Sequence, residues 1–93
     1  MRAIMQLEQL SLEVLGAEGM ILKAEEISSI NVRMEDGTLL GIRPGHTPLI
    51  GPAQAGIITY TMAGQSYQAQ IEAGILTVRK NLVRILTTGT KPG

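Results

Sequence analysis

The sequence of 93 residues contains no cysteine, no tryptophan and no phenylalanine, and its only aromatic rings besides one histidine belong to Tyr60 and Tyr67. Without cysteine the chain forms no disulfide and uses no thiolate chemistry, which is typical of proteins in a reducing compartment. Since apolar residues make up 44% of the chain, a core is available, but it must be aliphatic. The composition predicts one small domain with such a core.

An excess of charge of either sign is also missing, because eight basic residues balance eight acidic ones. A neutral surface does not attract phosphate backbones, and two tyrosines offer few platforms for base stacking. We therefore expect no nucleic-acid partner. No segment approaches the roughly 20 apolar residues of a membrane span, and the N-terminus shows no secretory pattern. We expect no direct insertion into a membrane and no export.

The sequence does show apolar residues that alternate with polar ones, with interruptions at glycines and polar pairs. This period of two predicts β-strands joined by tight turns, over residues 10–14, 20–24, 30–34, 39–42, 56–62, 67–71, 75–78 and 82–88. Strands with one apolar face need a facing sheet, so the pattern predicts an all-β fold, an antiparallel β-sandwich of two stacked sheets. We expect one domain over residues 1–93 with its core at about 10–88, N-terminal residues that are either disordered or an added strand, and a frayed tail.

Catalytic or metal-binding constellations are not found around the single histidine, His46. The serines have strand-like or turn neighbours and no G-x-S-x-G pattern, which argues against nucleophilic catalysis. A zinc or iron site needs three or four ligands, and here one histidine stands among scattered carboxylates. The terminal Gly-Thr-Lys lacks the rest of a phosphate-binding loop. We expect no active site, no metal and no cofactor.

The most distinctive segment is Gly-Ile-Arg-Pro-Gly-His-Thr-Pro-Leu-Ile-Gly-Pro at residues 41–52, which gathers three of the four prolines and the only histidine. Pro44-Gly45 predicts a type II turn, because proline presets φ at the second position and glycine accepts a positive φ at the third. Leu49 and Ile50 are expected to return the chain to the core. Two interpretations stay open: the segment only routes the chain between sheets, or it presents a stiff polar loop to another protein.

Residues 41–49 resemble the G-I-x-P-G-H-x-P-L signature of the epsilon subunit of bacterial F-type ATP synthases, called delta in mitochondria. The resemblance extends over about residues 10–86, because the opening strands, residues 55–60 and residues 73–86 are also similar to family segments. It implies a β-sandwich that clamps the gamma subunit and rests on the c-ring, as part of the rotor or central stalk. The implied function is that of a non-catalytic subunit that couples ion flow to ATP synthesis, peripheral to the cytoplasmic face of the cell membrane.

The same resemblance implies which residues make these contacts. The contact with gamma is expected from Arg43, Pro44, Gly45, His46 and Thr47. The contact with the c-ring is expected from the preceding loop, which comprises Glu35, Asp36, Gly37, Thr38 and Leu39. Leu39 stands where the family often carries an acidic residue, so Glu35 or Asp36 is expected to provide the negative charge.

The 93 residues stop before the two-helix hairpin that follows the sandwich in most of the family, so the resemblance implies neither nucleotide binding nor inhibition of hydrolysis. The alternative function is a small β-sandwich ligand-binding module. The two functions predict different surfaces: a rotor subunit needs an apolar or neutral patch on the outside near His46, whereas a ligand-binding module needs a concave pocket.

Overall fold

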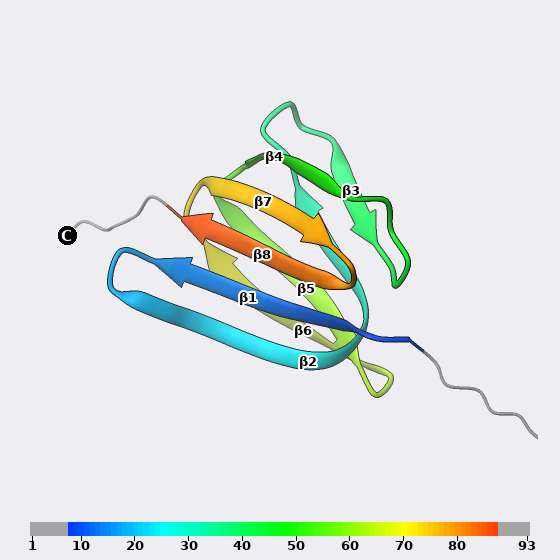
Figure 1. Cartoon of the computed structure of the whole chain (residues 1–93). Coiled ribbons are helices and arrows are strands. Elements are labelled where there is room, and N and C mark those ends of the chain that lie inside the picture. Colours follow the sequence, from blue (N-terminus) through cyan, green and yellow to red (C-terminus); the bar gives the residue numbers. More distant parts are fainter. Residues whose placement is uncertain (1–7, 88–93) are drawn as a thin grey trace, which may run out of the picture.

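The computed structural model describes residues 8–87, which form eight β-strands (Figure 1). None of these residues belongs to a helix that could cross a membrane. The predictions made for residues 1–7 and 88–93 lie outside the described residues. The strands are β1 (Leu10–Gly16), β2 (Gly19–Arg33), β3 (Leu39–Ile42), β4 (Leu49–Ala53), β5 (Gly56–Met62), β6 (Gln65–Ile71), β7 (Gly74–Arg79) and β8 (Leu82–Thr87).

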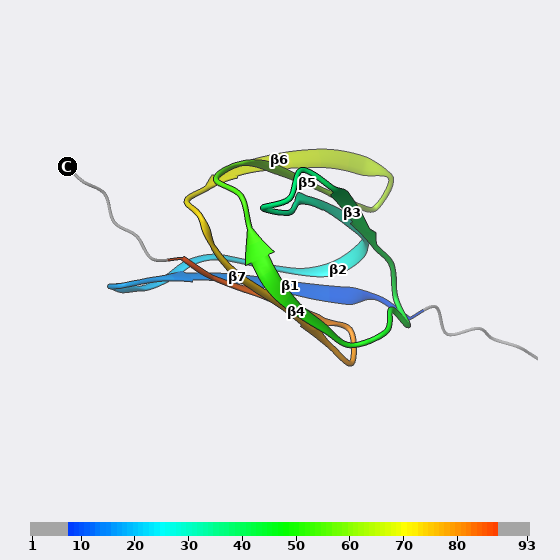
Figure 2. The ribbon, with the colours of Figure 1, turned by 90° about the horizontal axis from the view of Figure 1, so that it is seen from above.

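The eight strands form one continuous sheet that bends into two stacked layers (Figure 2). Its order is β4-β7-β8-β1-β2-β5-β6, and β3 pairs with β2. One layer contains β4, β7, β8, β1 and the first half of β2, and the other contains the second half of β2 with β3, β5 and β6. The predicted β-sandwich is therefore confirmed. One pairing differs from the antiparallel expectation, since β1 and β8 run parallel; no tight turn connects them to impose the opposite direction.

The long strand β2 joins the two layers. The sequence predicts separate strands at 20–24 and 30–34, but the chain stays extended between them. Glu26 has a φ of 61°, and the register with β1 shifts between Leu10 and Leu12. Such an irregularity bends a strand without ending it. Consequently β2 pairs with β1 in one layer and with β3 and β5 in the other.

Strand β4 lies where the sequence predicts only a connecting loop. It pairs with β7, with Leu49 opposite Val78 and Ala53 opposite Gly74. Because β4 is at the edge of the sheet, the proline that it contains is tolerated. The alternation of a strand sends Leu49 toward the core and leaves Ile50 71% exposed. The chain thus returns to the core through Leu49, whereas Ile50, which was expected to share in this return, faces outward.

The core lies between the two layers and is aliphatic, as the composition predicts. Its most deeply buried side chains are Leu10, Leu12, Val14, Ile27, Ile30, Val32, Ile42, Ile58, Leu76, Val78, Val83 and Ile85. Tyr60 is buried with them, and its ring stacks on that of Tyr67, with 5.6 Å between the ring centroids. Within residues 8–87 no polar or charged residue is buried. The fold is therefore stabilised by apolar burial and by the hydrogen bonds of the sheet.

Candidate functional site

The Pro-Gly turn follows β3 and has the predicted geometry. The backbone N–H of His46 donates to the carbonyl of Arg43 at 3.1 Å, and Gly45 has a φ of 84°. A hydrogen bond across four residues with a positive φ at the third is typical of a type II turn. No atom lies within 4 Å of the position that a Cβ of Gly45 would take, so the conformation, and not crowding, requires glycine there.

Asn81, which no sequence pattern singles out, fixes this turn in place. Its Oδ1 accepts a hydrogen bond from the backbone N–H of Gly45 at 2.7 Å, and its Nδ2 donates to Glu8 at 3.2 Å. Its backbone carbonyl accepts from the N–H of Ser11 at 2.9 Å. Asn81 occupies the turn between β7 and β8 with a φ of 67°, which asparagine tolerates well. One residue thus connects the Pro-Gly turn, the β7–β8 turn and the start of β1.

His46 is half-buried beside the turn. Its Nδ1 lies 2.7 Å from the carbonyl oxygen of Thr47, and since a carbonyl only accepts, this nitrogen carries a proton. The ring is thereby oriented, and Nε2 is left for a partner. Within residues 8–87 no group of three or more histidine, cysteine, aspartate or glutamate side chains could hold a metal ion. The arrangement is suited to a polar contact with another surface.

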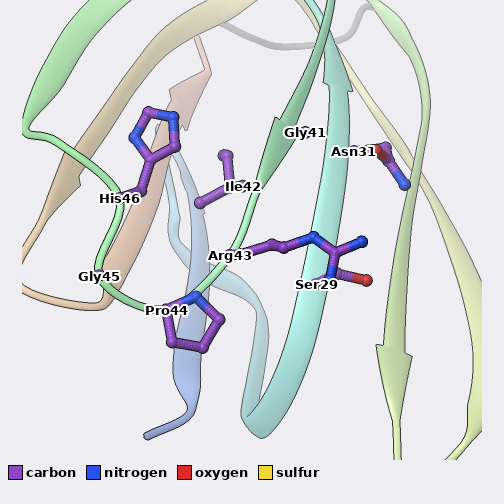
Figure 3. Close-up of a pocket in the computed structure, with 8 residues that line it drawn as sticks. All are labelled: Ser29, Asn31, Gly41, Ile42, Arg43, Pro44, Gly45 and His46. Carbon is purple, nitrogen blue, oxygen red and sulfur yellow. The ribbon is translucent and has the colours of Figure 1, made fainter.

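A hollow of about 350 Å³ lies between the turn and β2 (Figure 3). Arg43 extends across it toward Ser29, and no ion pair or hydrogen bond of the Arg43 side chain is found within residues 8–87. The lining residues are Ser29, Asn31, Gly41, Ile42, Arg43, Pro44, Gly45 and His46. Only Ile42 among them is buried, so this is an open hollow on the surface and not an enclosed ligand cavity.

The other predicted contact forms the hairpin turn between β2 and β3. The N–H of Gly37 donates to the carbonyl of Met34 at 2.9 Å, the N–H of Met34 donates to the carbonyl of Thr38 at 2.8 Å, and Gly37 has a φ of 92°. The Asp36 carboxylate accepts a hydrogen bond from the backbone N–H of Thr38 at 2.9 Å. This bond, with a contribution from the Thr38 side chain, lowers the pKa of Asp36 below its ordinary value.

Neighbouring segments brace this hairpin turn. The N–H of Glu35 donates to the carbonyl of Pro52 in β4 at 3.0 Å, and Nη1 of Arg33 donates to the carbonyl of Gly37 at 2.9 Å. The side chains of residues 35–39 are nevertheless exposed, and Leu39 is 56% exposed. The turn therefore presents two acidic side chains and one leucine from a fixed backbone.

The two predicted contact groups lie at opposite ends of β3 (Figure 1). Residues 35–38 precede this strand and residues 43–47 follow it, while Leu39 is its first residue. Four residues of strand span about 13 Å. The structure thus brings each predicted group together and keeps the two groups apart.

An apolar row crosses the outer face of the layer that contains β1. Its members are successive cross-strand neighbours: Pro52 is opposite Ile75, Ile75 opposite Leu86, Leu86 opposite Leu15, and Leu15 opposite Met20. Ile75, Leu86 and Met20 are 41%, 46% and 50% exposed. Ile50 extends the row along β4 toward His46, four residues away in the chain. Contiguous exposed apolar surface of this kind usually marks a protein interface.

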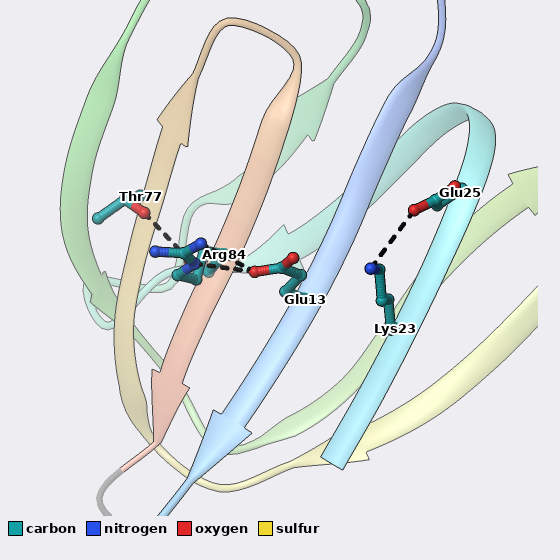
Figure 4. Close-up of polar contacts among 5 residues, drawn as sticks. All are labelled: Glu13, Lys23, Glu25, Thr77 and Arg84. Carbon is teal, nitrogen blue, oxygen red and sulfur yellow. Dashed lines mark hydrogen bonds and ion pairs between the residues drawn. The ribbon is translucent and has the colours of Figure 1, made fainter. Parts of the chain in front are cut away.

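Polar side chains run alongside the apolar row and neutralise one another (Figure 4). Nη2 of Arg84 lies 2.9 Å from Oε1 of Glu13, and Nζ of Lys23 lies 3.6 Å from the carboxylate of Glu25. Thr77 donates from its hydroxyl to the backbone carbonyl of Arg84 at 3.5 Å. This outer face is therefore apolar and close to neutral, which is the surface expected of a rotor subunit.

Comparison with known sequences places these features in a family. Residues 9–93 match the family described as "ATP synthase, Delta/Epsilon chain, beta-sandwich domain". The ATP synthase epsilon chain of Desulfitobacterium hafniense is 35% identical over 83 residues, which cover 89% of this chain and 61% of that relative. The epsilon chain of Solibacter usitatus is 33% identical over 79 residues, which cover 85% of this chain and 58% of the relative. The chain thus spans about three fifths of the length of these relatives.

Solved structures agree with this match. A chain of the Euglena gracilis mitochondrial ATP synthase, solved with its OSCP, F1 and c-ring, has a TM-score of 0.78 and 25% identity, over 97% of this chain and 57% of that one. A central-stalk and c-ring structure from Tetrahymena thermophila has a TM-score of 0.67 at 12% identity, over 91% and 67%, and shows the fold alone. The resemblance noted in the sequence is confirmed. The chain belongs to the family of ATP synthase delta and epsilon chains, through their β-sandwich domain.

Proposed function

We propose that this chain acts as a non-catalytic rotor subunit of an F-type ATP synthase, which links gamma to the c-ring and so couples ion flow to ATP synthesis. Its curated relatives are named epsilon chains, and a similar solved chain belongs to a synthase with its c-ring. The observation that supports the proposal best is the pair of braced turns at the two ends of β3.

The Pro-Gly turn, residues 43–47, is proposed to contact gamma. Because Asn81 and the type II geometry already order this turn, docking costs little conformational entropy. Nε2 of His46 and the guanidinium of Arg43 are available to polar groups of the partner. The apolar row, which Ile50 extends toward this turn, is proposed to supply the apolar part of the same contact.

The hairpin turn at residues 35–39 is proposed to contact the c-ring. Glu35 and Asp36 are exposed at its tip, so the turn suits a basic or neutral surface of the ring. The exposed Leu39 adds an apolar contact beside the two carboxylates. The hydrogen bonds from Glu35 to Pro52 and from Arg33 to Gly37 keep the turn fixed while it carries load.

Rotation is proposed to pass mechanically from one turn to the other. Strand β3 connects the two contacts without an intervening loop, and four residue pairs hold it against β2. Strand β2 is itself shared by both layers of the sandwich. A displacement of one turn is therefore transmitted through sheet hydrogen bonds and a packed core, which deform little.

In this role the chain has no active site of its own, holds no cofactor and binds no nucleotide through these residues. It is proposed to be peripheral, on the cytoplasmic face of the cell membrane. The open hollow beside Arg43 is assigned to the gamma contact, because the Pro-Gly turn forms one of its walls.

The test is a binding titration of the purified chain against purified gamma subunit and purified c-ring of the same synthase. We expect saturable binding to both, and calorimetry at about 1 mM ATP, in the range of ordinary nucleotide affinities, should give no saturable heat. Absence of binding to gamma and to the c-ring would overturn the proposal.

A further inference from the structure

The hairpin of β5 and β6 contains no charged residue. From Gly56 to Ile71 every residue is apolar, polar and neutral, or glycine. Strand β6 pairs only with β5 and ends the sheet order, so among the described residues its other edge is open (Figures 1 and 2). Natural edge strands are usually blunted by lysine, proline or a bulge. Strand β6 contains no lysine and no proline. It also has no bulge, since its register with β5 is unbroken from Gln65 to Ile71.

The turn of this hairpin determines which backbone groups face the open edge. Ala63 and Gly64 form a two-residue turn with φ values of 51° and 78°, typical of type I′. Such a turn is closed by a hydrogen-bonded pair, here Met62 and Gln65, and hydrogen-bonded pairs then alternate along the hairpin. Residues 65, 67, 69 and 71 therefore bond to β5. The N–H and C=O groups of Ser66, Gln68 and Gln70 point outward.

These three outward residues are self-complementary. If two copies of β6 pair antiparallel about Gln68, then Gln68 meets Gln68 and Ser66 meets Gln70, and every outward N–H and C=O finds a partner. The side chains fit as well, because Tyr67 of one copy then lies opposite the small Ala69 of the other. Neutral amide and hydroxyl pairs meet on the outer face, and no like charges are brought together.

From this geometry we propose that the free chain associates with a second copy of itself through β6, in an antiparallel pair centred on Gln68. The contact extends the β3-β2-β5-β6 layer into a sheet shared by two chains. It uses the edge opposite to β3, so it leaves both proposed rotor contacts uncovered. The inference therefore goes beyond the proposed function and does not depend on it.

The test uses the absence of native cysteine in the full 93-residue chain. Gln68 is the only residue that lies opposite its own copy, at a Cα distance of about 5.5 Å for a hydrogen-bonded pair, which a disulfide can bridge. Gln68→Cys should therefore give a disulfide-linked dimer under mild oxidation. In the control Ser66→Cys the two cysteines would be four residues apart, about 13 Å. We expect it to form the dimer at least about tenfold more slowly, since Cα atoms so far apart cannot be bridged directly.

Sedimentation of the unmodified chain provides the second measurement. At about 1 mM chain, where a contact of this small size should associate, we expect a reversible dimer. Gln68→Pro removes only the outward N–H, leaves the bonds to β5 intact, and should abolish the dimer without unfolding the chain. The control is Ala17→Lys at the remote β1–β2 turn, which should leave the dimer unchanged. Equal crosslinking of the two cysteine variants, or a monomer at every concentration, would overturn the proposal.

Discussion

Asn81 and Gly45, which are 36 residues apart in the chain, are joined by a hydrogen bond of 2.7 Å from the Gly45 backbone N–H to the Asn81 side chain. The bond connects the β7–β8 hairpin turn with the turn that leads from β3 in one layer to β4 in the other. It explains how a turn at the surface is held in one conformation without burial. The rigidity that we propose for the gamma contact depends on it.

Asn81→Gly should remove the side chain and keep the backbone conformation, because glycine also accepts the positive φ at this position. The variant therefore measures the effect of the side chain alone. Two side-chain hydrogen bonds are lost, and at about 0.5–1.5 kcal/mol each we expect the free energy of unfolding to fall by about 1–3 kcal/mol. Thermal unfolding measures this. Asn81→Asp keeps the acceptor for Gly45 and should preserve affinity for gamma, although it loses the bond to Glu8 and faces that carboxylate. An unchanged melting temperature in Asn81→Gly would contradict the bracing role.

His46→Ala should weaken binding to gamma more than it affects folding. The side chain is half-buried and bonds only to its neighbour Thr47, so the free energy of unfolding should change by less than about 1 kcal/mol. As a modest hot spot it should contribute about 1–2 kcal/mol to binding. Titrations against purified gamma and melting curves are compared for both chains. Ser66→Ala, at the opposite edge of the same layer, is the control. Equal affinities of wild type and His46→Ala would make the histidine merely structural.

Charge reversal in the hairpin turn should weaken coupling at the c-ring. The double variant Glu35→Lys with Asp36→Lys reverses both exposed acids, and ion pumping driven by ATP hydrolysis in membranes should fall several-fold. The neutral pair Glu35→Gln with Asp36→Asn keeps the shape, and the amide oxygen introduced by the second change would still accept from the Thr38 N–H. Circular dichroism checks that both variants fold. Pumping at the wild-type level in the reversed variant would remove the case for this contact.

The pH dependence of the same turn follows from the lowered pKa of Asp36. The Thr38 N–H bonds to the charged carboxylate, so the folded state favours that form. The stabilising contribution is present above the ordinary pKa and is lost as the pH falls through the lower, folded pKa. An NMR titration should place the Asp36 midpoint below 3.8, with the Thr38 amide signal following it. A midpoint at or above that value would show that the bond is absent in solution.

Gly74→Ala should destabilise the sandwich severely. A Cβ at this position would overlap the backbone carbonyl of Leu86, which cannot move without breaking the β7–β8 pairing. We expect a loss of about 3 kcal/mol or more, measured by urea unfolding. In the control Gly51→Ala the nearest atom is the flexible methyl group of Met34 at 3.3 Å, so the loss should be small. Similar unfolding midpoints for the two variants would contradict this account.

Features that depend on neighbouring residues were predictable. The turns at 36–37 and 44–45 require a positive φ at Gly37 and Gly45, and glycine, which accepts it, is visible at both positions in the sequence. The apolar faces of β5 and β8 were predictable for a similar reason, because alternation with period two sends every second side chain to the core. The signature at residues 41–49 likewise indicated the family, since it consists of adjacent residues.

Other features depend on segments that are far apart in the chain. Residues 25–29 became strand because Ile27 pairs with β1 across a bulge and Ile27 and Ser29 pair with β5, and β4 became strand because it pairs with β7. The apolar row exists only where five strands lie side by side, and Leu15 and Leu86 are 71 residues apart in the sequence. Local preferences contain no information about such pairings. The residue pattern thus determined the aliphatic sandwich. The hydrogen bonds that hold the two turns, the sharing of β2 between both layers and the surfaces for partners were decided by the tertiary structure. The reason is that long-range hydrogen bonds and burial depend on the fold as a whole.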